Sequence, residues 1–412
     1  MNEARMVDHL FRHQYGRMVA ILMRIFGLAH VETVEDAVQD TFASALLAWR
    51  NGPPDDPEAW LMRAARNRVV DIFRKMKADD RRHLRLESGS ATIAINELFM
   101  DDEIADSQLR MIFAACHPAL DPREQIAFAL KSISGFSTQE IATALMLKEE
   151  TVKKRLMRAR KAIQEKSIAF VIPQGKELTR RLDRVLDVLY LIFNEGFHST
   201  RQNTIIDKEL CGEALRLCKS LLENGTTRST VVYALFALMC FHSARLDSRM
   251  NEANELIDLR DQDRSMWYFP LIALGNDAMT RAMEGDDLSK YHFEAAIAAE
   301  HLKAPTFNDT DWDRILMWYE RLDALAPSPM NTLNRAMVQL QRNDPGSAAD
   351  LLRSLDPDAL AQREYLLHGA WGEYHALSNE REQARACYTN ALALVKNKAE
   401  RGYLQKKLQN LA

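Results

Sequence analysis

The sequence predicts an all-α protein built from more than one domain. Glycine (15) and proline (12) are scarce for a chain of 412 residues, and Ala, Leu, Arg and Glu, which favour helices, are abundant. No segment alternates β-branched and polar residues around Asn-Gly turns, as hairpins do. Because ordinary domains hold roughly 100–200 residues, the length predicts two to four of them.

The charge distribution is uneven, although the net charge is only −4. Residues 63–85 contain nine Lys or Arg against three Asp or Glu, and residues 148–166 contain eight against three. Two basic islands on an otherwise acidic chain predict two separate contacts with a polyanion such as nucleic acid. Solvated helix faces are the alternative, and they explain either island equally well when it is taken alone.

Three helices are predicted at the N-terminal end. Apolar residues recur every three or four positions over 6–26 and again over 34–49. The sequence NGPPDDP at 51–57 then breaks the pattern. Asp56 is placed to cap the next helix and Pro57 suits its first turn. This third helix carries the first basic island.

A polar stretch separates these helices from a second helical block. In that block, Ser137 and Glu140 fit a capping box at the start of a short helix. A turn and a very basic helix at about 149–163 follow. The basic helix is predicted to bury Val152, Leu156, Ala159 and Ile163. This outline is typical of helix–turn–helix units that read duplex DNA in the major groove.

The remainder of the chain is predicted to be helical and partly repetitive. Small residues recur 36 positions apart where paired helices would approach closely: Ala336 with Gly372, and Ala348 with Ala384. The pattern is clearest over 330–400 and resembles a tetratricopeptide repeat, whose period is about 34 residues. A helical bundle without repeats is the alternative.

Two sequence blocks in this order resemble the bacterial sigma-seventy family, in its extracytoplasmic-function branch. The segment GFSTQEIATALMLKEETVKKRLMRARKAI (135–163) resembles sigma region 4. Upstream, VEDAVQDTFASALLAW (34–49) resembles region 2.2, and PEAWLMRAARNRVVDIFRK (57–75) resembles regions 2.3 and 2.4. FAACHPALD (113–121), DVLYLIFNEGFHST (187–200) and the helical tail resemble the group of these sigma factors that has a C-terminal tetratricopeptide-like extension.

The resemblance implies an all-α architecture of two small helical sigma domains, the second a helix–turn–helix, followed by a helical, tetratricopeptide-like repeat domain. The expected boundaries are 1–78 for region 2, 79–106 for a linker, 107–170 for region 4 and 178–412 for the extension. Such a protein would bind core RNA polymerase and promoter DNA and help to melt the minus-ten region. It would need no catalytic residue, because the polymerase performs the chemistry.

The resemblance also implies which residues make these contacts. Polymerase would be bound by residues on about one face of helix 34–49: Asp36, Gln39, Asp40 and Phe42. The minus-ten element would be bound by Trp60, Arg63, Arg66, Asn67, Arg74 and Lys75. The minus-thirty-five element would be bound by Thr151, Lys153, Lys154, Arg155, Arg158, Arg160 and Lys161. Judged from the residues alone, Phe42 and Trp60 also fit the hydrophobic core.

Other classes of protein are disfavoured. No apolar run reaches the roughly 20 residues of a membrane span, and the first residues do not resemble a signal peptide. The five cysteines are scattered without a CxxC pair, which predicts free thiols in a reducing cytoplasm. No metal-ligand set, phosphate-binding glycine loop or nucleophile elbow is evident, so we expect neither cofactor nor enzymatic activity.

The partner of the extension stays open at this stage. The repeats are expected either to bind a protein regulator in a concave groove or to pack within the chain on the sigma domains. The main alternative function is a helix–turn–helix regulator that senses a signal through its repeats and does not bind core polymerase.

Overall fold

The structure is a computed structural model that describes residues 3–79, 101–145, 147–198, 206–252 and 255–411. Within these ranges the chain is helical and has no β-strand beyond an isolated bridge between Met250 and Leu256. The prediction of an all-α protein is therefore confirmed. The chain divides into two compact units, Met1–Leu191 and Ile192–Ala412, so the boundary lies inside the helix α9 (Gly175–Phe197).

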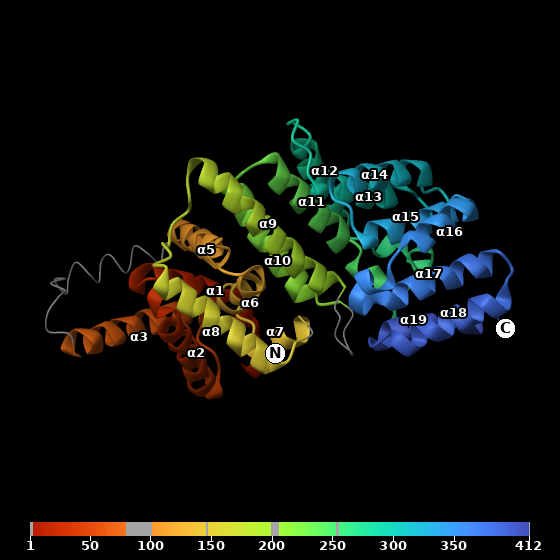
Figure 1. Cartoon of the computed structure of the whole chain (residues 1–412). Coiled ribbons are helices and arrows are strands. Elements are labelled where there is room, and N and C mark those ends of the chain that lie inside the picture. Colours follow the sequence, from red (N-terminus) through yellow and green to blue (C-terminus); the bar gives the residue numbers. More distant parts are fainter. Residues whose placement is uncertain (1–2, 80–100, 146, 199–205, 253–254, 412) are drawn as a thin grey trace. The chain divides into compact units, whose positions relative to one another are not determined.

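The first unit is built around α1, whose central side chains Tyr15, Met18 and Leu22 are almost completely buried. α1 packs against both α2 and α5 (Figure 1). The helices of this unit, besides the first part of α9, are α1 (Glu3–Phe26), α2 (Val31–Ala48), α3 (Pro57–Asp79), α5 (Asp101–Ala115), α6 (Pro122–Ser132), α7 (Thr138–Ala144) and α8 (Glu149–Glu165).

The predicted helix–turn–helix is present as α7 and α8, which pack against each other. The capping box forms as expected: the amide of Glu140 donates to Ser137 Oγ at 3.1 Å, and the amide of Ser137 donates to Glu140 Oε2 at 2.7 Å. All four residues predicted to be buried on the second helix are buried: Val152, Leu156, Ala159 and Ile163.

The second unit is a series of helices, and several helices pack against the next helix along the chain. These pairs include α11 with α12, α13 with α14, α15 with α16, and α17 with α18. Their bounds are α10 (Lys208–Glu223), α11 (Thr230–Ser243), α12 (Phe269–Ala282), α13 (Lys290–Lys303), α14 (Trp312–Leu325), α15 (Pro329–Gln341), α16 (Pro345–Ser354), α17 (Glu364–Leu377), α18 (Arg381–Leu394) and α19 (Lys398–Gln409). Between α11 and α12 runs a stretch of loops and short 3-10 turns that includes residues 255–261.

Small residues lie where the last helix pairs cross. Ala336, Ala348 and Ala384 have no exposed surface. Gly372 faces the ring of Tyr388 so closely that a Cβ at this position would lie 2.6 Å from ring carbon Cε1. The spacing of 36 residues thus marks equivalent helix–helix contacts in two successive pairs, whereas the assignment to tetratricopeptide repeats stays a prediction.

Most of the predicted linker, residues 80–100, lies outside the described residues, and α5 begins at Asp101. Cys116, Cys211, Cys218 and Cys240 are buried free thiols, and burial raises the pKa of Cys116 to about 12. In the part of the chain that the structure describes, no helix combines the length and the apolar character needed to cross a bilayer.

Gly372→Ala is expected to loosen the α17–α18 pair, because the added methyl group cannot fit without displacing the ring of Tyr388 or one of the two helices. Overpacking of this kind costs about 1–3 kcal/mol. Gly402→Ala on α19 is the matched control, since nothing lies within 4 Å of its Cβ position and alanine favours a helix. Hydrogen exchange in α17 and α18 should accelerate in the first variant only; equal rates would contradict this packing.

Candidate nucleic-acid and polymerase interface

The basic helix α8 presents cations to solvent on the side opposite its buried stripe. Lys153, Lys154, Arg158 and Lys161 are exposed. Among the described contacts, Lys154 and Arg158 form no ion pair, whereas Lys161 lies 3.6 Å from Glu165. Lys154 and Arg158 are therefore available to phosphate groups or to base edges.

The first turn of α8 is acidic, and a lysine of the same helix partly neutralises its charge. Lys148 occupies the N-cap position and gives no side-chain cap. The carboxylates of Glu149 and Glu150 suit the positive end of the helix, and Lys153 Nζ lies 3.1 and 3.2 Å from them. Lys153 is thus committed in part to its own helix rather than free for DNA.

Thr151 and Arg155, also predicted to contact DNA, are half-buried. Burial, together with the nearby charge of Arg123, lowers the pKa of Arg155. The guanidinium nevertheless stays charged at physiological pH, because its ordinary pKa lies above 12.

Arg160 was predicted to contact phosphate, and the structure gives it a different partner. Its Nη2 atom lies 2.6 Å from Glu35 Oε2, and its Nη1 atom lies 3.2 Å from Glu32 Oε1. The side chain of Arg160 is 25% exposed and that of Glu35 only 2% exposed. In this arrangement the guanidinium of Arg160 is occupied by internal carboxylates, and its predicted contact with phosphate stays a prediction.

Glu35 is the centre of a buried polar junction between the N-terminal helices and the helix–turn–helix block. Its other carboxylate oxygen, Oε1, accepts a hydrogen bond of 2.6 Å from Ser132 Oγ at the end of α6. A buried carboxylate is tolerated when it is paired and hydrogen-bonded. Glu35 on α2 therefore ties together α2, α6 and α8.

Two glycines allow the same parts of the chain to approach closely. A Cβ on Gly16 of α1 would lie 1.8 Å from the carbonyl oxygen of Ile133, which leaves no room for any other residue. Gly135 has a φ of +72° and lies against the ring of Tyr15. The junction is thus close-packed as well as charge-paired.

The exposed face of α2 contains three of the four predicted polymerase contacts, Asp36, Gln39 and Asp40. Asp40 forms an ion pair with Arg68 of α3. Phe42 is a correction: it is 4% exposed and its ring meets that of Phe11 edge-on at 4.9 Å, so it belongs to the hydrophobic core.

Leu46 and Leu47 are the large apolar residues of this helix that are exposed, at 48% and 62%. Leu47 could have been identified from the sequence, because the helical period places it opposite the buried stripe. Leu46 follows Phe42 by four residues and so was expected on the buried stripe, and its exposure corrects that expectation.

The predicted minus-ten residues lie along α3. Arg63 and Asn67 are exposed, Arg66 is half-buried, and Trp60 is half-buried with its ring edge-on to Trp49 at 5.4 Å. The helix begins as predicted, with Asp56 Oδ1 accepting from the amide of Ala59 at 2.9 Å. Arg74 and Lys75 belong to the same helix, but their side chains lie outside the described residues.

Arg160→Ala is expected to lower the thermal unfolding midpoint of the full chain, because it leaves the buried carboxylate of Glu35 without a cation. Removing one partner of a buried pair costs about 3 kcal/mol. The neighbouring Lys161→Ala should change stability by less than about 0.5 kcal/mol, as is usual for an exposed pair. If both variants melt alike, Arg160 and Glu35 are not paired in solution.

The comparisons with known proteins agree with this geometry. Residues 10–78 match the family described as sigma-70 region 2, and residues 110–163 match sigma-70 region 4. Residues 181–283 match a family of unknown function (DUF6596). No solved structure matches the chain.

One relative matches over the whole chain, and two others match over a little more than a third of it. An uncharacterized protein of Rhizobium meliloti, R00370, is 32% identical over all of this chain and 97% of its own length. The RNA polymerase sigma factor CnrH of Cupriavidus metallidurans is 30% identical over 36% of this chain and 79% of its own. The ECF RNA polymerase sigma factor SigE of Mycolicibacterium smegmatis is 27% identical over 38% and 60%, respectively.

The matches cover both basic helices and the order in which they occur, and the helical C-terminal region follows them. Sigma factors are transcription initiation factors without catalysis of their own. The chain belongs to the extracytoplasmic-function branch of the sigma-70 family, and to the members that have a C-terminal extension.

Proposed function

We propose that this sigma factor binds core RNA polymerase through α2, binds the minus-ten element through α3 and binds the minus-thirty-five element through α8. The observation that carries the proposal is the presence of two separate basic helices in one compact unit. One DNA-reading helix would suffice for a simple regulator, whereas a sigma factor contacts two promoter elements.

The exposed face of α8 suits upstream duplex DNA. Its 17 residues span about 25 Å, long enough to enter a major groove at one end and follow phosphates with the other. Lys154 is the best candidate for a base-edge contact and Arg158 for a phosphate contact, since both are exposed and unpaired among the described residues. Lys161 has a second partner in Glu165, so it is the weaker candidate.

The exposed part of α3 suits unpaired bases. Arg63 and Asn67 are exposed and lie about one turn apart on the helix. Cations and amides of this kind bind single-stranded nucleic acid together with stacking side chains. Trp60 is in contact with Trp49, which favours a structural role for its ring.

The face of α2 suits polymerase. Asp36 and Gln39 are exposed, and Leu47 adds apolar surface beside them. An interface of this composition pairs a hydrophobic centre with a charged rim. Asp40 is already paired with Arg68, so its contribution to polymerase binding requires that this surface ion pair opens or is shared.

The packed junction at Glu35 implies a conformational change on promoter binding. Elements about 25 base pairs apart are separated by about 85 Å along B-DNA. A compact unit of 191 residues has a radius of gyration of about 16 Å, so it cannot reach both. We propose that polymerase binding separates α8 from α2 and exchanges the Glu35 carboxylate for phosphate as the partner of Arg160.

Lys154→Ala is expected to weaken binding of the reconstituted holoenzyme to promoter DNA by roughly 5- to 100-fold, the value of one base contact. Co-elution with core polymerase should be unchanged, because Lys154 is not on α2. Lys176→Ala, an exposed lysine on α9, is the matched control and should bind DNA normally. Equal DNA affinity for both variants, or failure of the native chain to co-elute with core, would contradict the proposal.

A further inference from the structure

The C-terminal unit contains a cavity of 640 Å³ that neither the sequence nor the comparisons assign to a ligand. Most of its walls come from α15, α17 and α19 and from the irregular segment 255–261, which we call the strap. This volume lies within the usual range of binding sites. The three helices supply these apolar lining residues: Met330, Leu333, Met337, Leu366, Ala370 and Leu404.

The strap is attached to these helices by side chains alone, as far as the described contacts go. Its backbone bonds run to itself or to its flanks: the amide of Ile257 donates to the carbonyl of Arg249 at 2.9 Å, and Gln262 Nε2 donates to the carbonyl of Ile257 at 3.2 Å. No residue from 255 to 261 is buried, whereas Arg249 and Gln262 beyond its two ends are. Because segments with few buried contacts open at low cost, the strap can leave while both ends stay anchored.

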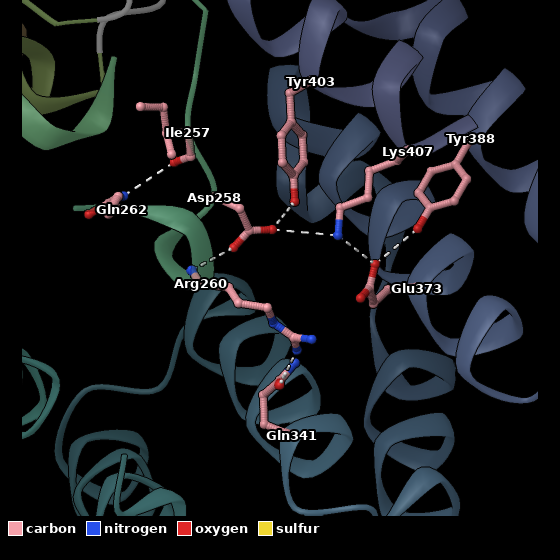
Figure 2. A network of polar contacts seen from close by, with 9 residues as sticks. All are labelled: Ile257, Asp258, Arg260, Gln262, Gln341, Glu373, Tyr388, Tyr403 and Lys407. Atoms are coloured by element: carbon pink, nitrogen blue, oxygen red, sulfur yellow. Dashed lines mark hydrogen bonds and ion pairs between the residues drawn. The ribbon is translucent and has the colours of Figure 1, made fainter. Parts of the chain in front are cut away.

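Two acidic residues of the strap, three positions apart, contact one face of α19. Asp258 Oδ2 accepts from Tyr403 at 2.8 Å and lies 3.5 Å from Lys407 Nζ (Figure 2). Glu255 Oε2 lies 2.7 Å from Lys406 Nζ. Burial alone would raise the pKa of Asp258, but Lys407 and Tyr403 outweigh it and lower that pKa. The strap therefore presents ionised carboxylates to a basic helix face.

The helices hold their side of this network without help from the strap. Lys407 Nζ also lies 3.2 Å from Glu373 Oε2 on α17, and the same oxygen accepts from Tyr388 on α18 at 3.0 Å (Figure 2). On α15, Gln341 Oε1 accepts from Arg260 of the strap at 3.0 Å. Groups positioned in advance bind a ligand with less loss of entropy. The strap thus lies on the helices as a ligand would lie in a prepared site.

The charges on the helices define what can replace the strap. Without it, Lys406 would have no ion pair among the described residues and Lys407 would keep only Glu373. Glu400 does not compete for these lysines, because it accepts from Tyr365 at 2.8 Å and feels the charges of two arginines. The exposed face would therefore accept two carboxylates in the positions that the strap now fills.

A separate ligand must overcome the advantage of a tethered strap. A segment of the same chain is present at high effective concentration, so a competitor needs contacts that the strap does not make. The cavity provides them, since its apolar lining is open to a larger apolar side chain. We propose that the face of α15, α17 and α19 binds an acidic and apolar segment of a partner protein, with two carboxylates three residues apart, in place of the strap.

The sequence of the strap supplies the probe. A fluorescent peptide with the sequence of residues 255–262, ELIDLRDQ, is titrated with the full-length chain, and its polarisation is measured. Asp258→Asn weakens the strap and leaves the lysines of α19 intact, so this variant should bind the peptide roughly tenfold more tightly than the native chain, the effect of one charge-assisted hydrogen bond. Asp261→Asn, an exposed acid with the same charge change, should bind within about twofold of the native chain.

Two altered peptides test the chemistry of the site without changing the chain. QLINLRDQ, in which both carboxylates are amides, should not bind the Asp258→Asn chain. Phenylalanine in place of the peptide's isoleucine should tighten binding, because it adds apolar surface beside the cavity. No binding of ELIDLRDQ to the Asp258→Asn chain, or equal affinity for the acidic and amide peptides, would overturn the proposal. The titration contains neither polymerase nor DNA, so its outcome does not depend on the proposed promoter contacts.

Discussion

The buried carboxylate of Glu35 is the constraint on which the first unit depends. An ionised group with 2% exposure must be paired, and its two partners come from distant parts of the sequence. Ser132 lies 97 residues away and Arg160 lies 125 residues away. Satisfying this one side chain therefore requires that the N-terminal helices and the helix–turn–helix block pack together, and it determines where the C-terminal end of α8 lies.

This constraint bears on function because the same arginine suits two partners. A guanidinium pairs with a carboxylate and with a phosphate by similar bidentate geometry. In the compact unit Arg160 is held by Glu35 and Glu32. Under the proposed exchange of partners, the compact form hides one cation from DNA, and polymerase binding would release it.

Helical periodicity correctly predicted the features that depend on a single helix. The buried stripe of α8, the capping box of Ser137 and Glu140 and the cap at Asp56 follow from local spacing, and the structure confirms each. The ring contact of Phe42 and the ion pair of Arg160 could not be predicted in this way, because their partners, Phe11 and Glu35, belong to other helices. The burial of Glu35 could have been predicted from the sequence, since it lies on the apolar stripe of α2 between Val31 and Val38.

The C-terminal cavity was beyond such reasoning. Its network joins Asp258 to Tyr403 across 145 residues, and no periodic pattern links an irregular segment to a distant helix. The repeat spacing did locate Gly372 and its small partners, which are needed where helices touch.

The most direct measurement is energy transfer between dyes on α2 and α8. Thr33→Cys and Gln164→Cys place labels at exposed sites beside the Glu32–Arg160 contact, and Cys387→Ser removes the partly exposed native thiol. In the free protein the transfer should be high, and addition of core polymerase with promoter DNA should lower it strongly as α8 leaves α2. Unchanged transfer in a complex that initiates transcription would contradict the account.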